Sequence, residues 1–381
     1  MLECWSVEFH RSVSDMDILI SEDLDAPAIQ RLAGKHTLVR DPDLWKNPAA
    51  LKKKIHGART IVIRNQTRIT ADLLSAAPNL IGIGRIGVGL DNIDVPAATK
   101  AGIVVIAPLD ANAASVADLT MGLMLALARK IPLADRSTKA GAWDRKTCTG
   151  IELDGKTLAI CGLGRIGRMV ALRALAFGMR LVVFDPFVKE NSPALAGLDA
   201  TLCQKLEDAL AQADFVTVHS PLTPETKHLF NARRFAVMKR GAYFINTSRG
   251  GVMDERALQA ALEKGQLAGA ALDVREVEPP STNLLRRTSS VKPPPSNLLR
   301  QKHYGGREAL RRSGSTTEVG KHYGGQESAF DTLDNVILTP HVGAFTTEAQ
   351  TRTFEAVCDD LDRLLRGEPA INFVNIPQPN K

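Results

Sequence analysis

Short apolar runs alternate with helix-like stretches along most of the chain. The runs are unbroken and rich in Val, Ile and Leu, which is typical of strands buried on both faces of a parallel sheet. Two longer stretches, 112–130 and 348–366, predict helices. We expect the 112–130 helix to connect the first domain to the second, and the 348–366 helix to fold back on the first domain. The predicted strands are 17–20, 36–39, 60–63, 80–83, 103–106, 157–161, 181–184, 215–218, 242–246 and 268–274.

One stretch, 156–185, has every part of a dinucleotide-binding unit in order. The apolar run 157–161 is followed at once by G-x-G-x-x-G, then by a helix-forming stretch and by a second strand that ends in Asp185. Such glycines permit a tight turn, close approach of a pyrophosphate and helix–strand packing, and the terminal carboxylate accepts from the ribose hydroxyls. The sequence therefore predicts NAD binding. The fingerprint glycines are Gly162, Gly164 and Gly167.

A second G-x-G-x-x-G, at Gly82, Gly84 and Gly87, lacks this context. The segment 88–96 that follows it is too rich in Gly, Asp, Asn and Pro for a helix, and the next strand does not end in an acidic residue. We therefore expect no cofactor phosphate at this copy.

Composition excludes several classes of protein. The chain has 381 residues, 44% of them hydrophobic, and no apolar run long enough to span a membrane. Five cysteines are scattered without disulfide or metal-ligand spacing, so we expect a reducing, cytoplasmic setting and no metal. The net charge of +6 comes entirely from residues 281–330, and we expect no nucleic-acid partner.

Residues 281–330 interrupt the α/β pattern. They are rich in Pro, Ser, Gly and Arg and contain two imperfect duplications, 283–286 with 297–300 and 302–306 with 321–325. This composition argues against a packed core and predicts a disordered surface insertion. Its alternatives are a regulatory or nucleic-acid-binding segment and a tolerated or mistranslated insertion, and the composition favours the latter.

Three polar motifs follow predicted strands, at 246–251, 272–279 and 338–344. Open α/β sheets bind ligands at the carboxyl ends of their strands, so these motifs are candidates for the site. Each has an ordinary structural alternative: a turn histidine, a loop cation or a capping aspartate. Asp91, Asn92 and Asp94 form a further polar cluster, which we expect to hydrogen-bond its own loop backbone.

The chain resembles the D-isomer-specific 2-hydroxyacid dehydrogenases over residues 16–278 and 331–375. The motifs that carry the resemblance are 87–94, 115–118, the fingerprint, 219–223, the Arg249 loop, 273–278 and Pro340-His341. The resemblance implies catalytic Arg249, Glu278 and His341. It implies substrate contacts from Arg85, Val88, Gly89 and Arg249, and cofactor contacts from Gly162, Gly164, Arg165, Ile166, Gly167, Asp185, Ser220, Thr247 and Asp273.

We therefore predict two Rossmann-like, doubly wound α/β domains. A flavodoxin-like substrate domain would comprise 16–111 with 345–381, and an NAD-binding domain 112–344. The protein would transfer hydride between NAD and a small 2-hydroxy or 2-oxo acid, as a homodimer. The alternative is an NAD(H)-sensing interaction protein similar to the C-terminal-binding corepressors.

The chemistry needs these residue types independently of the resemblance. Imidazole takes or returns the hydroxyl proton, a neighbouring carboxylate favours its charged form, and guanidinium binds the substrate carboxylate. Asp185 would repel a 2′-phosphate, which favours NAD over NADP. Arg64, Arg85 and Arg275 are candidates to contact a charged distal group on the substrate, such as a phosphate or sulfonate. We expect an aromatic or apolar residue at the position of Arg275.

Overall fold

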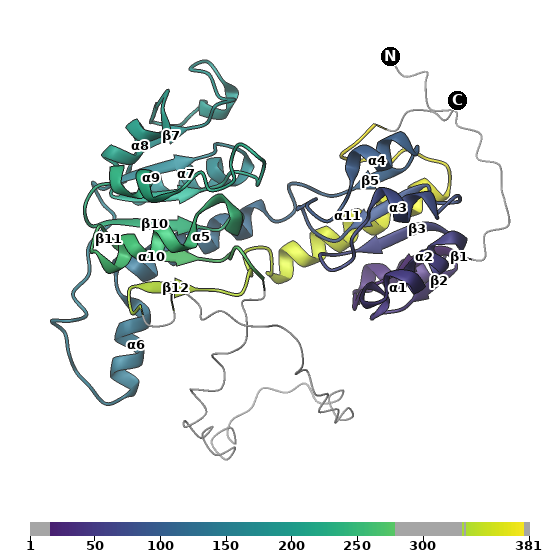
Figure 1. Cartoon of the computed structure of the whole chain (residues 1–381), viewed down its shortest axis with the longest axis horizontal. Coiled ribbons are helices and arrows are strands. Elements are labelled where there is room, and N and C mark those ends of the chain that lie inside the picture. The colour runs from purple at the N-terminus through teal and green to yellow at the C-terminus, as the bar shows by residue number, and fades with distance from the viewer. Residues whose placement is uncertain (1–15, 279–329, 331–332, 377–381) are drawn as a thin grey trace.

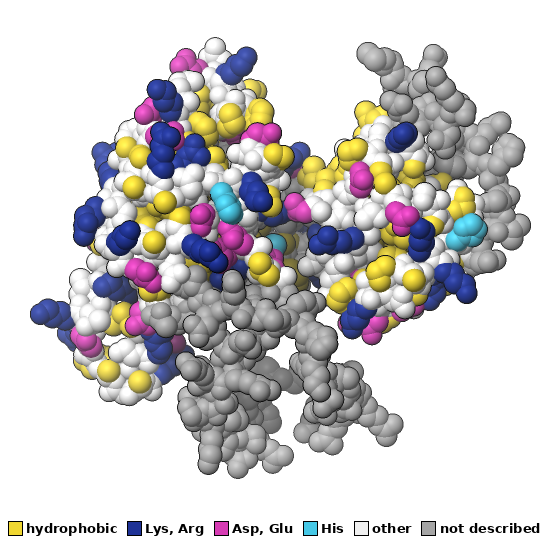
Figure 2. Space-filling model, viewed as in Figure 1, with side chains coloured by type: hydrophobic (Ala, Val, Ile, Leu, Met, Phe, Trp, Pro, Cys, Tyr) yellow, Lys and Arg dark blue, Asp and Glu magenta, His cyan; other side chains and the backbone are white. Residues whose placement is uncertain are grey.

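The computed structural model describes residues 16–278, 330 and 333–376. It contains two parallel sheets, each flanked by helices, which form two α/β domains joined near α5 and α11 (Figure 1). Figure 2 shows a cleft between the two masses. The predicted fold class is confirmed.

The first sheet has five strands in the order β2-β1-β3-β4-β5, all parallel. This is the flavodoxin-like order, in which successive strands are added first on one side of β1 and then on the other, so that the strand order reverses between β1 and β3. The strands are β1 (Met16–Ile20), β2 (Leu38–Arg40), β3 (Ala58–Ile63), β4 (Gly82–Arg85) and β5 (Val104–Ile106); the helices between them are α1 (Pro27–Ala33), α2 (Pro48–Lys54), α3 (Ala71–Ser75) and α4 (Val95–Lys100).

The second glycine motif serves packing of this sheet. Gly82 and Gly84 lie within β4, under the carboxy-terminal helix α11 (Thr347–Leu365). A Cβ on Gly84 would lie 2.7 Å from Val357 Cγ1, which is closer than real Cβ contacts. The missing side chains therefore let α11 lie close on the sheet. The 88–96 segment was predicted to contain no helix, but α4 begins at Val95, with Asp94 as its N-cap and Pro96 in its first turn.

The second sheet has seven parallel strands in the order β12-β11-β10-β9-β6-β7-β8. Its first six strands in chain order have the Rossmann arrangement, with the reversal between β6 and β9. The strands are β6 (Thr157–Cys161), β7 (Arg180–Phe184), β8 (Ala200–Leu202), β9 (Phe215–Val218), β10 (Ala242–Asn246), β11 (Leu267–Leu272) and β12 (Val336–Leu338); the helices are α5 (Ala113–Ala128), α6 (Ile131–Lys139), α7 (Arg165–Ala176), α8 (Leu206–Gln212), α9 (Ala232–Val237) and α10 (Glu255–Glu263).

The helix predicted over 112–130 ends at Ala128, two residues early. Lys130 takes a left-handed conformation, with φ 52°, and the chain then starts α6, none of whose residues is buried. Figure 1 shows α6 projecting from the seven-stranded domain.

The predicted insertion, 281–330, lies outside the described residues except at its last position. Phe330 is buried in the core of the seven-stranded domain, among residues of β9, β10 and β11. Phe330 lies six positions before the first residue of β12.

Candidate active site

The glycine fingerprint forms an open turn at the amino end of α7. Gly162 has φ 99°, and Gly167 packs so closely on it that a Cβ would overlap the Gly162 carbonyl oxygen. A Cβ on Gly164, in contrast, would meet no protein atom within 4 Å. Gly164 is the N-cap of α7 and offers no side-chain cap, so the first amide groups of the helix are available to a phosphate. These features fit a bound dinucleotide.

Asp185 and Ser220 border this turn. The Asp185 carboxylate accepts from the amide of Leu163, inside the fingerprint, at 2.8 Å. Ser220 follows β9, where the strand order of the sheet reverses, and its hydroxyl donates to the Cys161 carbonyl at 3.3 Å. Both residues therefore lie where doubly wound sheets bind nucleotides.

Other residues predicted to bind the cofactor have partners within the protein. Arg165, on the first turn of α7, forms an ion pair with Asp110. Ile166 packs partly against the core, and the buried Thr247 hydroxyl lies 2.9 Å from that of Thr120 on α5. Their contacts with the cofactor stay predictions.

His341 and Glu278 form an ion pair across the ends of β11 and β12. His341 Nδ1 lies 2.7 Å from Glu278 Oε2, although the residues are 63 positions apart. The hydrogen bond to Glu278 raises the pKa of His341, opposed by burial. Burial opposes ionisation of Glu278, but bonds from His341 and the Arg275 amide outweigh it and lower the pKa of Glu278. The contact with Glu278 is made at Nδ1, so the ring has a second nitrogen, Nε2, that can exchange a proton with a bound molecule.

The loop that carries His341 is held by Asp273. This buried carboxylate accepts from the Thr339 hydroxyl at 2.6 Å and from the amides of Val342 and Gly343, each at 2.8 Å. His341 itself has φ 54°, a strained conformation for a residue with a side chain. Asp273, predicted from the resemblance to contact the cofactor, therefore positions the histidine loop.

Arg249 follows β10 and reaches toward the five-stranded domain. Its Nε lies 3.0 Å from Asp91 Oδ2, in the loop after β4. A Cβ on Gly89 would overlap the Arg249 guanidinium, so a side chain at this position would displace the arginine from the 88–91 loop. Val88 precedes Gly89 in that loop.

Sequence reasoning missed Asp91 as a partner of the site. Asp94 was expected to bind its own loop, but it is the N-cap of α4, where its side chain accepts from the Ala97 amide. Asn92 instead donates to the carbonyls of Arg64 and Thr67 in the preceding loop, and Asp91 crosses to the other domain. No signal in a single sequence distinguishes these three neighbouring side chains.

Arg85 and Arg64 line the five-stranded side of the site. Arg85 is buried and donates to the carbonyls of Ile86 and Gly89, at 2.6 and 2.9 Å, so it shapes the loop that meets Arg249. Burial lowers the pKa of Arg85 to about 10. Arg64 lies over the ring of Phe345 and donates to Gln350 at 2.8 Å.

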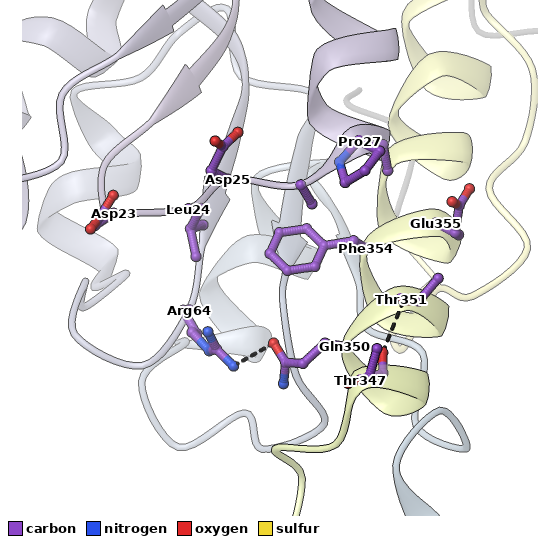
Figure 3. A pocket seen from close by; sticks show the side chains of 12 residues that line it. Asp23, Leu24, Asp25, Pro27, Arg64, Thr347, Gln350, Thr351, Phe354 and Glu355 are labelled. Carbon is purple, nitrogen blue, oxygen red and sulfur yellow. Dashed lines mark hydrogen bonds between the residues drawn. The ribbon is translucent and has the colours of Figure 1, made fainter. Parts of the chain in front are cut away.

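A cavity of ≈ 370 Å³ lies beside Arg64, bounded by the loop after β1 and the first turns of α11 (Figure 3). It occupies the carboxyl ends of β1 and β3, where the strand order of the first sheet reverses. The charged side chains around it are Arg64, Asp23, Asp25 and Glu355.

Arg275, the third cation considered for a distal group, lies elsewhere. Its guanidinium forms two hydrogen bonds of 2.9 Å with Glu255 and lies over the ring of Phe330. The structure thus directs it into the seven-stranded domain.

Within the described part of the chain, no group of three or more His, Cys, Asp or Glu side chains could hold a metal ion. No helix among those residues is both long and apolar enough to span a membrane.

Comparison with known proteins identifies the relatives of this chain. Residues 121–294 match the family model described as D-isomer specific 2-hydroxyacid dehydrogenase, NAD binding domain. A D-3-phosphoglycerate dehydrogenase of Methanocaldococcus jannaschii is 41% identical over 94% of this chain and 59% of its own length. The chain thus spans about three fifths of the length of this curated relative.

Two solved structures are similar over nearly their whole length. A protein from Thermus thermophilus is 32% identical, with a TM-score of 0.75, and the match covers 94% of this chain and 100% of that one. A D-lactate dehydrogenase from Aquifex aeolicus, complexed with NAD and lactic acid, is 28% identical, with a TM-score of 0.75 and coverage of 95% and 100%.

Proposed function

The chain belongs to the D-isomer specific 2-hydroxyacid dehydrogenase family, and from that premise we propose that it interconverts a small D-2-hydroxy acid and its 2-oxo acid with NAD. The observation that carries the proposal is the convergence of Arg249, Glu278 and His341 at the ends of three neighbouring strands, β10, β11 and β12.

Each of these side chains has a distinct task. The Arg249 fork binds the substrate carboxylate. In the oxidation direction His341 takes the hydroxyl proton, and in the reverse direction it returns the proton to the carbonyl oxygen. Glu278 stabilises the imidazolium and fixes its tautomer through the 2.7 Å contact at Nδ1. Bound NAD would supply the hydride acceptor.

We further propose that the substrate carries a second anionic group. Arg64 supports this proposal, because its guanidinium donates to the neutral side chain of Gln350 and its carbonyl accepts from Asn92, in the loop that meets Arg249. Arg85 contributes positive potential there but is occupied with backbone carbonyls, and Arg275 is paired with Glu255. Among the candidate cations, Arg64 therefore suits contact with a distal phosphate or sulfonate.

The test is oxidation of NADH, followed by absorbance, with pyruvate, glyoxylate, hydroxypyruvate and 3-phosphohydroxypyruvate. His341→Gln should lower kcat by about 10²- to 10⁴-fold, the usual contribution of a general acid–base group. His36→Gln is the matched control, since His36 also pairs with a carboxylate, Asp362, at 2.8 Å but precedes β2 and so lies away from the carboxyl ends of the strands. Arg64→Gln should raise KM for the phosphorylated acid alone.

Absence of turnover with every acid, while NADH still binds, would instead favour an NAD(H)-sensing interaction protein. No observation favours that alternative. Equal losses in His341→Gln and His36→Gln would contradict the role of His341.

The proposal extends to domains, assembly and setting. We assign 16–111 with 345–381 to the substrate domain and 112–344 to the NAD-binding domain, which is supported by the packing of α11 on β4 and of α5 on α7.

A homodimer through the α6 region is supported by exposed Ile131, Trp143 and Ile151. Light scattering of Ile131→Asp should then report a monomer. Four described cysteines carry free thiols, which fits a cytoplasmic setting.

A further inference from the structure

The turn that carries Glu278 is hydrogen-bonded to the amino end of α10. Glu255, the first residue of that helix, accepts two hydrogen bonds of 2.9 Å from the Arg275 guanidinium. The same carboxylate accepts from the Glu276 amide at 2.8 Å. One carboxylate therefore fixes two consecutive residues of the 275–278 turn.

The turn in turn holds the catalytic carboxylate. The Arg275 amide donates to Glu278 Oε1 at 2.9 Å, and Glu278 Oε2 meets His341. A continuous series of contacts thus runs from Glu255 through Arg275 and Glu278 to His341. Every bond in the series joins side chains or amides of the described residues.

The ion pair is well sheltered from water. The side chains of Arg275 and Glu255 are 10% and 15% exposed, whereas His341 is 46% exposed. The ring of Phe330, buried in the core, covers the guanidinium at 5.1 Å. A bidentate pair with this little solvent has a defined geometry that an exposed pair lacks.

The same turn also contacts the loop of Arg249. A Cβ on Gly250 would overlap the carbonyl group of Arg275, so the two backbones touch. A shift of the 275–278 turn would therefore reach both Glu278 and the loop that presents Arg249.

We propose that Glu255 and Arg275 are positioning residues, whose ion pair holds the 275–278 turn so that the Glu278 carboxylate meets His341. This inference rests on the proposed function. Neither side chain touches the reacting atoms, so each acts only through Glu278. The charged groups that face His341 are Glu278, Asp273 and Arg249. Of these three, the Glu255–Arg275 ion pair sets the position of Glu278.

The test uses Glu255→Gln, Arg275→Met and the double variant in the full chain. Arg275→Lys keeps the charge without the two-pronged geometry and should be intermediate. Arg234→Met is the matched control: Arg234 pairs with Glu207 at 3.1 Å in the same domain, with side chains 26% and 30% exposed, away from the strand ends.

The first readout is the pKa of His341, followed by NMR of its ring proton and assigned with His341→Gln. Glu255→Gln and Arg275→Met should lower it toward that of free imidazole, and Arg234→Met should leave it unchanged. The second readout is kcat, which should fall by about ten- to a hundredfold, as for a misplaced catalytic group, with the affinity for NADH retained. The double variant should be no worse than Arg275→Met, because both single changes remove the same ion pair and a glutamine oxygen at position 255 can still accept from the Glu276 amide.

Loss of thermal stability without a change in the His341 titration or in kcat would overturn the inference, because the pair would then be only structural. Effects of equal size in Arg234→Met would overturn it as well. Should Arg275→Met fail to fold, the His341 titration and kcat of Glu255→Gln and Arg275→Lys still test the positioning role. The NMR titration needs no turnover, so failure of the proposed dehydrogenase activity is distinguished from failure of the positioning role.

Discussion

Replacing Gly164 by alanine should separate cofactor binding from folding. Gly164 has φ −72° and ψ −164°, which alanine adopts readily, and its added Cβ would meet no protein atom within 4 Å. The free energy of unfolding should therefore stay the same or rise by about 0.4–1 kcal/mol, since alanine restricts the unfolded chain. We predict that the pyrophosphate of NAD approaches the helix through this open space.

The methyl group would displace that pyrophosphate from the amides of α7. Losing one hydrogen bond to a charged group costs about 1.5–3 kcal/mol, which corresponds to a Kd for NADH higher by roughly ten- to a hundredfold. Fluorescence titration with NADH measures the binding, and urea denaturation measures the stability.

Two further glycines serve as controls. Gly167→Ala would overlap the Gly162 carbonyl and should destabilise the fold by about 1–3 kcal/mol. Gly122, exposed on α5, also has no atom within 4 Å, so Gly122→Ala should leave NADH binding unchanged. An unaltered Kd in Gly164→Ala would refute the assignment of the open turn to the pyrophosphate.

Three other changes test the site and the fold. Glu278→Gln should lower the raised pKa of His341, so that oxidation of the hydroxy acid begins at lower pH in a rate profile. In the unchanged protein the His341–Glu278 ion pair stabilises the fold below the unfolded imidazole pKa of about 6.5, and this stabilisation is lost as pH rises through the raised pKa of His341 in the folded protein. Gly84→Ala, 2.7 Å from Val357 Cγ1, should lower the free energy of unfolding by about 1–3 kcal/mol in urea, and an unchanged midpoint would contradict the packing argument. Asp185→Asn should weaken the preference for NADH over NADPH by about tenfold or more in comparative kinetics, since a unit-charge repulsion near the surface is about 1–4 kcal/mol.

The sequence by itself determined the fold class and the nucleotide unit. Unbroken apolar strands alternating with helices allow few arrangements other than parallel α/β sheets. The fingerprint was decisive because strand, glycines, helix and Asp185 follow one another within about 30 residues, so local order carries the information. The absence of that order also excluded the copy at Gly82.

The arrangement of the site was decided only by tertiary structure. His341 and Glu278 are 63 positions apart, and their contact depends on β11 and β12 being neighbours in the sheet. Asp91 reaches Arg249 from another domain, which no local pattern encodes.

Side-chain direction was equally beyond the sequence. Arg275 was a candidate for an anion pocket, but its guanidinium pairs with Glu255 on α10 and packs on the ring of Phe330, so it points into the seven-stranded domain. The contacts of Asp273 with Thr339 and Val342 also depend on β11 and β12 lying side by side. Long polar side chains take whichever partners the packed backbone brings within reach, because a sheltered charge needs a partner. The sequence therefore supplies the chemical groups, and the packing of distant segments selects which of them meet.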